Sequence, residues 1–147
     1  MSSQTFDKGL AMRKRVLGSE YVEKSLAAAD EYTRPLQELV TEYCWGAVWN
    51  RPGLELQTRS LLNVAMLTAL NRPHELRIHI AGALTNGCTR EEIIETLLQT
   101  AIYCGVPRAR EATHRPPAGR RETGGARQRP ESTRIVREVF REKAAAG

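Results

Sequence analysis

The chain has 147 residues, 41% hydrophobic and 27% charged, which is ordinary for a globular protein with one core. Its first eight residues contain no apolar stretch, so we expect no secretory signal. The longest apolar stretch, 61–70, contains Asn63 and Thr68 and is too short to span a bilayer, which excludes a membrane protein.

The net charge of +5 would suggest nucleic-acid binding, but it is unevenly distributed. Residues 1–106 carry 11 Lys/Arg and 12 Asp/Glu (net −1), residues 107–132 carry 7 Arg and 3 Glu (net +4), and residues 133–147 carry 4 basic and 2 acidic residues (net +2). No aromatic residues lie among the arginines and no groove-reading motif surrounds them, so we do not expect nucleic acid as the partner.

Nearly every segment of the chain is predicted to be helical. A polar helix is predicted over 5–16 and a second over 20–32, with Ser19 as its cap. Pro35 suits the first turn of a third helix, which closes at 45–49 and leads into a turn at 50–53.

The second half of the chain is also predicted to be helical. The segment 55–70 is apolar on nearly every side after Arg59, which predicts a central, buried helix. Pro73 can begin a helix that ends near Gly87, and Thr89 with Glu92 forms a capping box for the next. No stretch alternates with a period of two, so the expected fold class is all-α.

The segment 107–132 interrupts the helical pattern. Its prolines and glycines are scattered among seven arginines, and its apolar residues are too few to order it, so an irregular loop is expected. An amphipathic helix is predicted again within 133–147. The expected organisation is therefore a helical domain over 1–106, this segment, and a C-terminal helix.

Glu75 and His79 stand four residues apart, so they share one face of the helix predicted from Pro73. A carboxylate beside an imidazole can orient and tune a proton donor near neutral pH. The alternative is a plain surface pair, or a buried histidine bonded to a helix carbonyl. The three cysteines, Cys44, Cys88 and Cys104, are odd in number and lack a CxxC motif. They favour a reducing cytoplasm and argue against a thiolate metal site.

Several blocks together resemble the carboxymuconolactone decarboxylase family. The most specific are the Trp-Gly-x-x-Trp block beginning at Trp45 and the Ala-Ile-Tyr-Cys-Gly-Val-Pro run ending at Pro107. The matching stretches are 9–18, 43–54, 58–61, 65–66, 69–72, 76–79, 86–87, 89–93 and 97–107, so the resemblance covers about residues 6–107.

The resemblance implies an all-helical alkyl hydroperoxidase D-like bundle and a ring-like homo-oligomer, typically a hexamer. It also implies a lyase of protocatechuate catabolism (the beta-ketoadipate pathway) that converts the anionic 4-carboxymuconolactone to 3-oxoadipate enol-lactone and carbon dioxide, with neither metal nor organic cofactor. A sister branch has a Cys-x-x-Cys-x-x-x-His motif; aligned on His79, its cysteines fall on Arg72 and Glu75. A thiol peroxidase needs both thiols, so that activity is not expected.

In this chemistry the substrate's lactone is the electron sink, and the protein stabilises a dienolate and delivers one proton. His79, oriented by Glu75, is the expected donor. Arg59 and Arg13 are candidates for gripping substrate carboxylates through the guanidinium fork, although a solvated first helix is the simpler interpretation for Arg13. Three alternative functions for the protein remain open: another lactone-processing enzyme, a weak thiol-dependent peroxidase, and a non-catalytic oligomer with a basic loop.

The remaining candidates have structural alternatives. Trp45 and Trp49 could wall a pocket, although buried tryptophan is more often core. Cys104 is expected to pack rather than react, and His74 is a candidate second base or an exposed residue of a first helical turn. His114 falls where the family has a histidine seven residues after its proline. The prolines that follow it stop a helix there, which suggests an insertion or an out-of-frame stretch.

Overall fold

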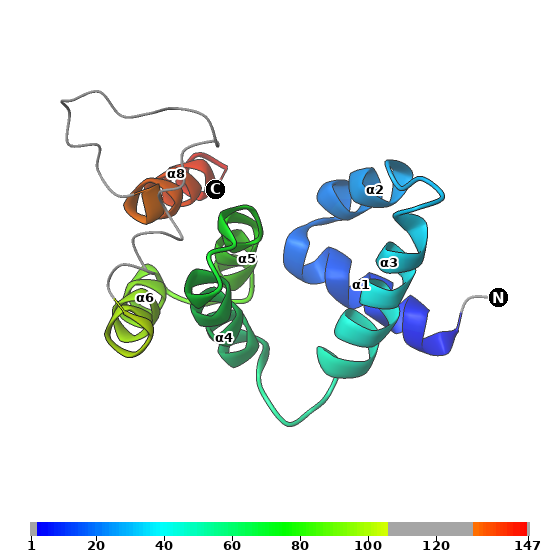
Figure 1. The fold of residues 1–147 in the computed structure, drawn as a ribbon, viewed down its shortest axis with the longest axis horizontal. Helices are drawn as coiled ribbons and strands as arrows, with labels where there is room; N and C mark the ends of the chain where they lie inside the picture. The colour runs from blue at the N-terminus through cyan, green and yellow to red at the C-terminus, as the bar shows by residue number, and fades with distance from the viewer. Residues whose placement is uncertain (1–2, 106–130, 147) are drawn as a thin grey trace. The chain divides into compact units, whose positions relative to one another are not determined.

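The computed structural model describes residues 3–105 and 131–146, and within them the chain is all-α, as predicted (Figure 1). The chain divides into two compact units, 1–59 and 60–147, called here the N-terminal and C-terminal units. No helix in the described ranges is long and apolar enough to cross a membrane.

The N-terminal unit begins with α1 (Gln4–Leu17), whose cap is Ser3 accepting from the Phe6 amide at 3.0 Å. The second helix, α2 (Ser19–Ala27), is shorter than the predicted 20–32. The Asp30 carboxylate explains the difference, because it accepts hydrogen bonds from the amides of Tyr32 and Thr33 and from the Thr33 hydroxyl. This local turn competes with continuation of the helix.

The predicted third helix is in fact two elements. A short α3 (Arg34–Leu39) passes into a π-helix, η1 (Val40–Val48), in which the Trp49 amide bonds the Cys44 carbonyl, five residues back, at 3.0 Å. Single π-helical stretches are rare and occur frequently at functional sites. Leu36, Leu39 and Tyr43 recur at helical spacing in this segment, but all three are exposed.

The core of the N-terminal unit is a stacked pair of indoles. The rings of Trp45 and Trp49 have centroids 4.7 Å apart, both residues are buried, and Val16 of α1 lies with them. Partly buried side chains complete this cluster: Met12, Leu17, Val40 and Leu56.

Helix α1 and η1 touch through their backbones at two glycines. A Cβ on Gly9 would overlap the Thr41 carbonyl oxygen, and a Cβ on Gly46 would overlap the Thr5 carbonyl oxygen. Neither obstacle is a flexible side chain that could rotate away, so both positions exclude any larger residue. The contact places the buried face of α1 directly against η1.

The C-terminal unit contains α4 (Leu56–Ala69, whose first turn lies in the N-terminal unit), α5 (Pro73–Thr85), α6 (Arg90–Cys104) and α8 (Glu131–Ala145). The predicted capping box of α6 is present, with Glu92 N bonded to Thr89 Oγ1 and Thr89 N bonded to Glu92 Oε2. Gly87 follows α5 with φ of 89°, as expected for a glycine just past a helix end.

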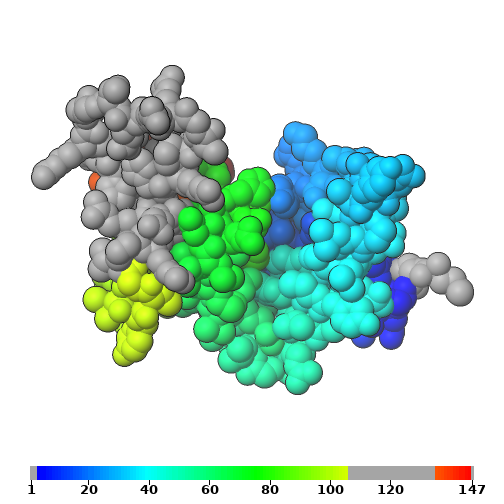
Figure 2. Space-filling view, viewed as in Figure 1, coloured from blue at the N-terminus to red at the C-terminus, as the bar shows by residue number. Residues whose placement is uncertain are grey.

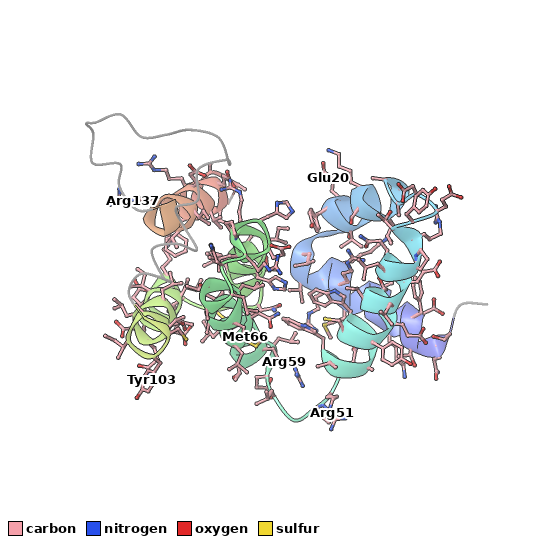
Figure 3. All side chains as sticks on the ribbon, viewed as in Figure 1. Glu20, Arg51, Arg59, Met66, Tyr103 and Arg137 are labelled. Atoms are coloured by element: carbon pink, nitrogen blue, oxygen red, sulfur yellow. The ribbon has the colours of Figure 1, made fainter. Side chains whose placement is uncertain are left out.

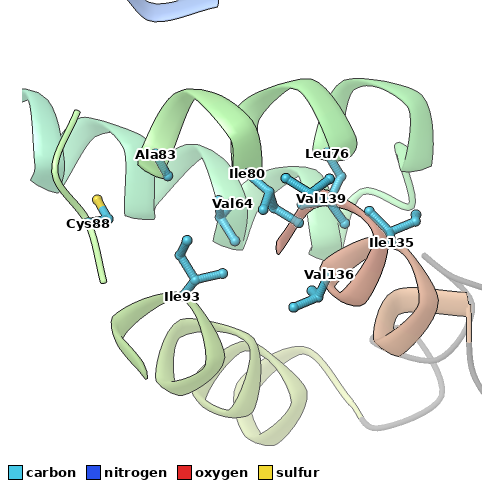
Figure 4. Packing of buried hydrophobic residues seen from close by; sticks show 9 residues of the cluster. All are labelled: Val64, Leu76, Ile80, Ala83, Cys88, Ile93, Ile135, Val136 and Val139. Carbon is cyan, nitrogen blue, oxygen red and sulfur yellow. The ribbon is translucent and has the colours of Figure 1, made fainter. Parts of the chain in front are cut away.

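The core of this unit joins all four helices (Figure 4). Its buried members are Val64, Leu76, Ile80, Ala83, Cys88, Ile93, Ile135, Val136 and Val139. Helix α8 therefore contributes to the core, although residues 105–130 separate it in sequence from α6. Outside the core, Arg77 of α5 pairs with Glu138 at 2.8 Å and with Glu142 at 2.5 Å on α8.

The prediction that α4 is buried on every side is wrong. Ser60, Val64 and Thr68 face inward, whereas Leu62, Met66 and Leu70, four residues apart, are exposed. In Figure 3 the side chain labelled Met66 lies on α4. The apolar surface of α4 thus exceeds what the described part of this chain covers.

The glycine contact gives a stability prediction. In a helix interior, Gly9→Ala would gain about 1 kcal/mol of helix propensity, but overlap with a backbone carbonyl should cost more. We expect the free energy of unfolding of the N-terminal unit to fall by about 2 kcal/mol. Urea unfolding followed by tryptophan fluorescence reads this unit, because both tryptophans of the chain lie in its core.

Gly53→Ala is the matched control, since a Cβ there would meet no atom within 4 Å. It should change stability by less than about 0.5 kcal/mol. Equal stability of the Gly9→Ala variant and the wild type would show that the two helices are not held at backbone contact.

Candidate active site

The predicted pair of Glu75 and His79 lies on α5, as its spacing required. Glu75 is in the exposed first turn and His79, one turn later, is partly buried. The side chain of Asn63 on α4 reaches the same imidazole, with its Nδ2 atom 3.4 Å from His79 Nδ1. An amide N–H that donates to Nδ1 leaves the ring proton of the neutral imidazole on Nε2.

Burial determines the charge of this ring. Desolvation lowers the pKa of His79 to about 4, and the nearby Glu75 carboxylate opposes it by raising the pKa. At neutral pH the free protein therefore holds His79 as a neutral imidazole, with roughly one ring in a thousand protonated. The predicted role of His79 as proton donor stays a prediction, and in that role the ring must first gain a proton that it does not hold in the free state.

An added negative charge would reverse this state. Two unit charges about 4 Å apart interact by about 4 kcal/mol at an effective dielectric of 20, which equals about three pKa units. A carboxylate beside the ring would thus bring the pKa of His79 back to near neutrality. The arrangement can hold a neutral base in the free state and an acid in an anion-bound state.

The sequence treated Arg13 as a solvated residue or a carboxylate ligand, and the structure shows that it is not solvated. Arg13 is 5% exposed, and its Nη1 donates to Thr41 Oγ1 at 3.0 Å. Its Nε is buried and has no hydrogen-bond partner among the described residues. Burial lowers the pKa of the Arg13 guanidinium from its usual value, and Tyr21 and Cys44 oppose that shift.

Arg59 is partly buried at the start of α4. Its Nη2 donates at 3.0 Å to the carbonyl of Arg51, which lies in the turn at 50–53; both residues are labelled in Figure 3. Its Nε, like that of Arg13, is buried without a partner among the described residues. The described contacts tie Arg59 to the turn, and its predicted role in gripping substrate stays a prediction.

The tryptophans pack in a core, whereas Cys104 does not. Trp45 and Trp49 form the core of the N-terminal unit, which agrees with their structural interpretation. Cys104 was expected to pack, but it is exposed at the last residue of α6, so that prediction is wrong. The apolar face of α6 packs through Ile93 and Leu97, earlier in the helix.

The structure describes only one of the two other candidate histidines. His74 is exposed in the first turn of α5, as its alternative interpretation required. His114 lies outside the described residues. Within those residues, no three His, Cys, Asp or Glu side chains come together as metal ligands.

Sequence reasoning missed Asn63 and Thr41. Asn63 had a signal, because it is one of two polar residues in an apolar run. Thr41 had none, because its role depends on the contact of α1 with η1. There its hydroxyl donates to the Gln37 carbonyl at 2.7 Å and accepts from Arg13.

Comparison with known proteins places the chain. Residues 34–115 match the carboxymuconolactone decarboxylase family. The chain is 50% identical over 107 residues to nitrosuccinic acid decarboxylase npaB of Metarhizium robertsii, covering 73% of this chain and 75% of that protein. It is 39% identical over 111 residues to 4-carboxymuconolactone decarboxylase of Acinetobacter baylyi, covering 76% and 83%. An uncharacterized 15.0 kDa protein of Paracoccus denitrificans is 38% identical over 74 residues, 48% of this chain and 54% of that protein.

The fold and these similarities define the protein as an all-helical enzyme of the decarboxylase class. The chain belongs to the carboxymuconolactone decarboxylase family.

Proposed function

We propose that the protein decarboxylates 4-carboxymuconolactone to the enol-lactone of 3-oxoadipate, with His79 as the proton donor to ring carbon. The departing carboxylate is attached to the ring carbon next to a double bond that is conjugated to the lactone carbonyl, so the electron pair left by carbon dioxide is delocalised as a dienolate. The observation that carries this proposal is the partly buried imidazole of His79, held by Asn63 beside the Glu75 carboxylate.

The chemistry of the site supports a proton delivered only in the bound state. The free ring is neutral, and an anionic substrate would stabilise its protonated form. After carbon dioxide leaves, the imidazolium can give this proton to the dienolate, which restores the neutral ring that burial favours. Asn63 fixes the ring orientation, and Glu75 supports the charged form.

Nitrosuccinic acid is a second candidate substrate, favoured by the 50% identity to a decarboxylase of that compound. Loss of its carboxylate next to the nitro group would leave a nitronate, and one proton added to the same carbon would complete the reaction. Both reactions need the protein to stabilise a delocalised oxyanion and to protonate a carbon atom. A thiol peroxidase is not supported, because Arg72 and Glu75 occupy the positions of the required thiols.

The assay that tests this function measures carbon dioxide released from each candidate substrate by the purified protein. We expect turnover of 4-carboxymuconolactone, with kcat for His79→Gln reduced by about 100-fold or more, since glutamine keeps a hydrogen bond but has no transferable proton. His74→Gln, in the exposed first turn of the same helix, should retain wild-type turnover.

The substrates separate the two proposals. Release from nitrosuccinic acid alone would establish the second candidate. Release from neither, by a folded protein, would contradict the proposed function, and wild-type turnover in His79→Gln would remove His79 from the donor role.

We also propose that the protein is a homo-oligomer located in the cytoplasm. Ile94, Leu98 and Ile102 are uncharged, exposed and spaced four residues apart on α6. Figure 2 shows part of this helix, in yellow, at the surface. Two copies can place such uncharged stripes together without like-charge repulsion. Leu98→Glu should reduce the mass measured by sedimentation equilibrium, and a wild-type mass of one chain would contradict the oligomer.

The free cysteines support a location in the reducing cytoplasm, and a disulfide in protein isolated from cells would argue against that location.

A further inference from the structure

The contact between Asn63 and His79 is held by the packing of α4 against α5. Val64 and Ile80, the residues that directly follow the two members of the pair, are fully buried in the core of the C-terminal unit (Figure 4). Both helices are therefore fixed at the level of the contact. The Asn63 amide lies against one particular nitrogen of the ring, with Nδ2 placed 3.4 Å from Nδ1.

The amide and the ring differ in the hydrogen bonds that they can make. A neutral imidazole has one nitrogen that donates and one that accepts, whereas both nitrogens of the charged ring donate. The Asn63 amide can take either role at its end, because Nδ2 donates and Oδ1 accepts. In the free protein Nδ2 faces Nδ1, so the neutral ring of His79 accepts at Nδ1 and carries its single proton on Nε2.

The charged form of the ring does not suit this arrangement. Protonation at Nδ1 sets a second N–H of His79 directly against the N–H groups of Asn63 Nδ2. Two donors in contact repel each other, and each loses a hydrogen bond in a partly buried place, which is unfavourable. A half-turn of the amide about its last side-chain torsion replaces Nδ2 with Oδ1 and restores the bond. That torsion is broad and roughly two-fold in asparagine, so both positions are accessible without movement of the helix.

We propose that the Asn63 amide reverses with the charge of His79: it donates to Nδ1 of the neutral ring and turns to accept from Nδ1–H of the charged ring. The proposal rests on the proposed function for the step that uses the charged ring. Asn63 is thus a positioning residue, because it acts through His79.

The protons balance over one turnover. The ring takes one proton from solvent at Nδ1, where Oδ1 of Asn63 then holds it. The Nε2 proton passes to the electron pair on the dienolate carbon, and the electrons of the N–H bond stay on Nε2 as a lone pair. The ring is then neutral, with its proton on Nδ1. Loss of that proton and gain of one at Nε2 restore the resting form.

Nitrogen NMR of the His79 ring tests the resting state without substrate, because ring nitrogens with and without a proton differ strongly in chemical shift. Near pH 7 we expect the wild-type ring to carry its proton on Nε2 and none on Nδ1. Asn63→Asp, whose carboxylate can only accept, should move a proton to Nδ1. A wild-type ring already protonated on Nδ1, or an Asn63→Asp ring without a proton there, would overturn the proposal.

Asn86→Asp is the matched control, because it makes the same change at another polar contact between α4 and α5. Asn86 directly follows α5, and its Nδ2 donates at 2.9 Å to Oγ of Ser60, three residues before Asn63 on α4. The new carboxylate has a different partner, so the proton of the His79 ring should stay on Nε2. A proton found on Nδ1 in this variant as well would make added charge the cause and contradict the specific role of Asn63.

Asn63→Leu has nearly the same shape and no polar atom, and it tests the charged state. If Oδ1 accepts from the charged ring, its loss should lower the pKa of His79, because hydrogen bonds to charged groups are stronger than those to neutral groups. An amide that could not turn would oppose the charged ring, so its removal would raise the pKa, and that result would overturn the proposal. Glu75, the charged group that shifts the pKa of this ring, is unchanged in the variant.

Turnover separates the role of Asn63 from the reaction itself. Asn63→Leu should lower kcat by about tenfold or more. Asn63→Asp can still accept from Nδ1–H, so it should lose less kcat and instead raise KM, because its charge repels an anionic substrate. Equal losses of kcat in the two variants, or wild-type kcat in Asn63→Leu, would reject the role of Asn63 alone. Absence of carbon dioxide release by a wild type with the expected ring protonation would reject the reaction alone.

Discussion

Gly9 and Gly46 carry no side chains at the points where α1 and η1 approach each other, and the N-terminal unit is arranged around that fact. Each glycine lies against a backbone carbonyl of the other helix, at a separation that a single methyl group would prevent. One turn beyond Gly9, the same approach brings Arg13 to Thr41 and buries its guanidinium. The absence of a side chain at Gly9 thus determines where the guanidinium of Arg13 is buried.

Burial shifts the pKa of two candidate basic residues, Arg13 and His79, in the same direction. Desolvation lowers the pKa of both Arg13 and His79, so each charged form is stabilised less than it would be in water. The consequences differ, because an arginine remains charged and needs a counter-ion, whereas a histidine with a pKa of about 4 gives up its proton. An anion bound beside the His79 ring would favour its protonated form.

The helices and the Glu75–His79 pairing followed from sequence, because caps, prolines and four-residue spacing are local signals. The Thr89 capping box and the helix beginning at Pro73 are examples. The early end of α2 was missed because the hydrogen bonds of Asp30 compete with the helix, and the π-helix was missed because apolar spacing does not register an added residue per turn. The exposure of Leu62 on α4 could not be predicted, because an apolar helix surface does not reveal what covers it.

The candidate site, like the fold, could be predicted from the sequence only in part. Spacing identified His79, but the level of its pKa depends on burial, and the contact with Asn63 depends on how α4 and α5 pack. Burial of Arg13 contradicts the ordinary expectation for a charged residue in a polar first helix, because the glycine contact that causes it leaves no periodic signal in the sequence.

The central claim is that His79 is neutral in the free protein and becomes protonated when an anionic substrate binds. Titration of the His79 ring by NMR, with its resonance assigned from the His79→Gln spectrum, tests this directly. The account predicts a pKa of about 4 in the free protein and a rise of about three units when a small dicarboxylate such as succinate binds beside the ring. A ring that stays neutral near pH 6 while succinate is bound would contradict the account, because no proton would then be available for the carbanion.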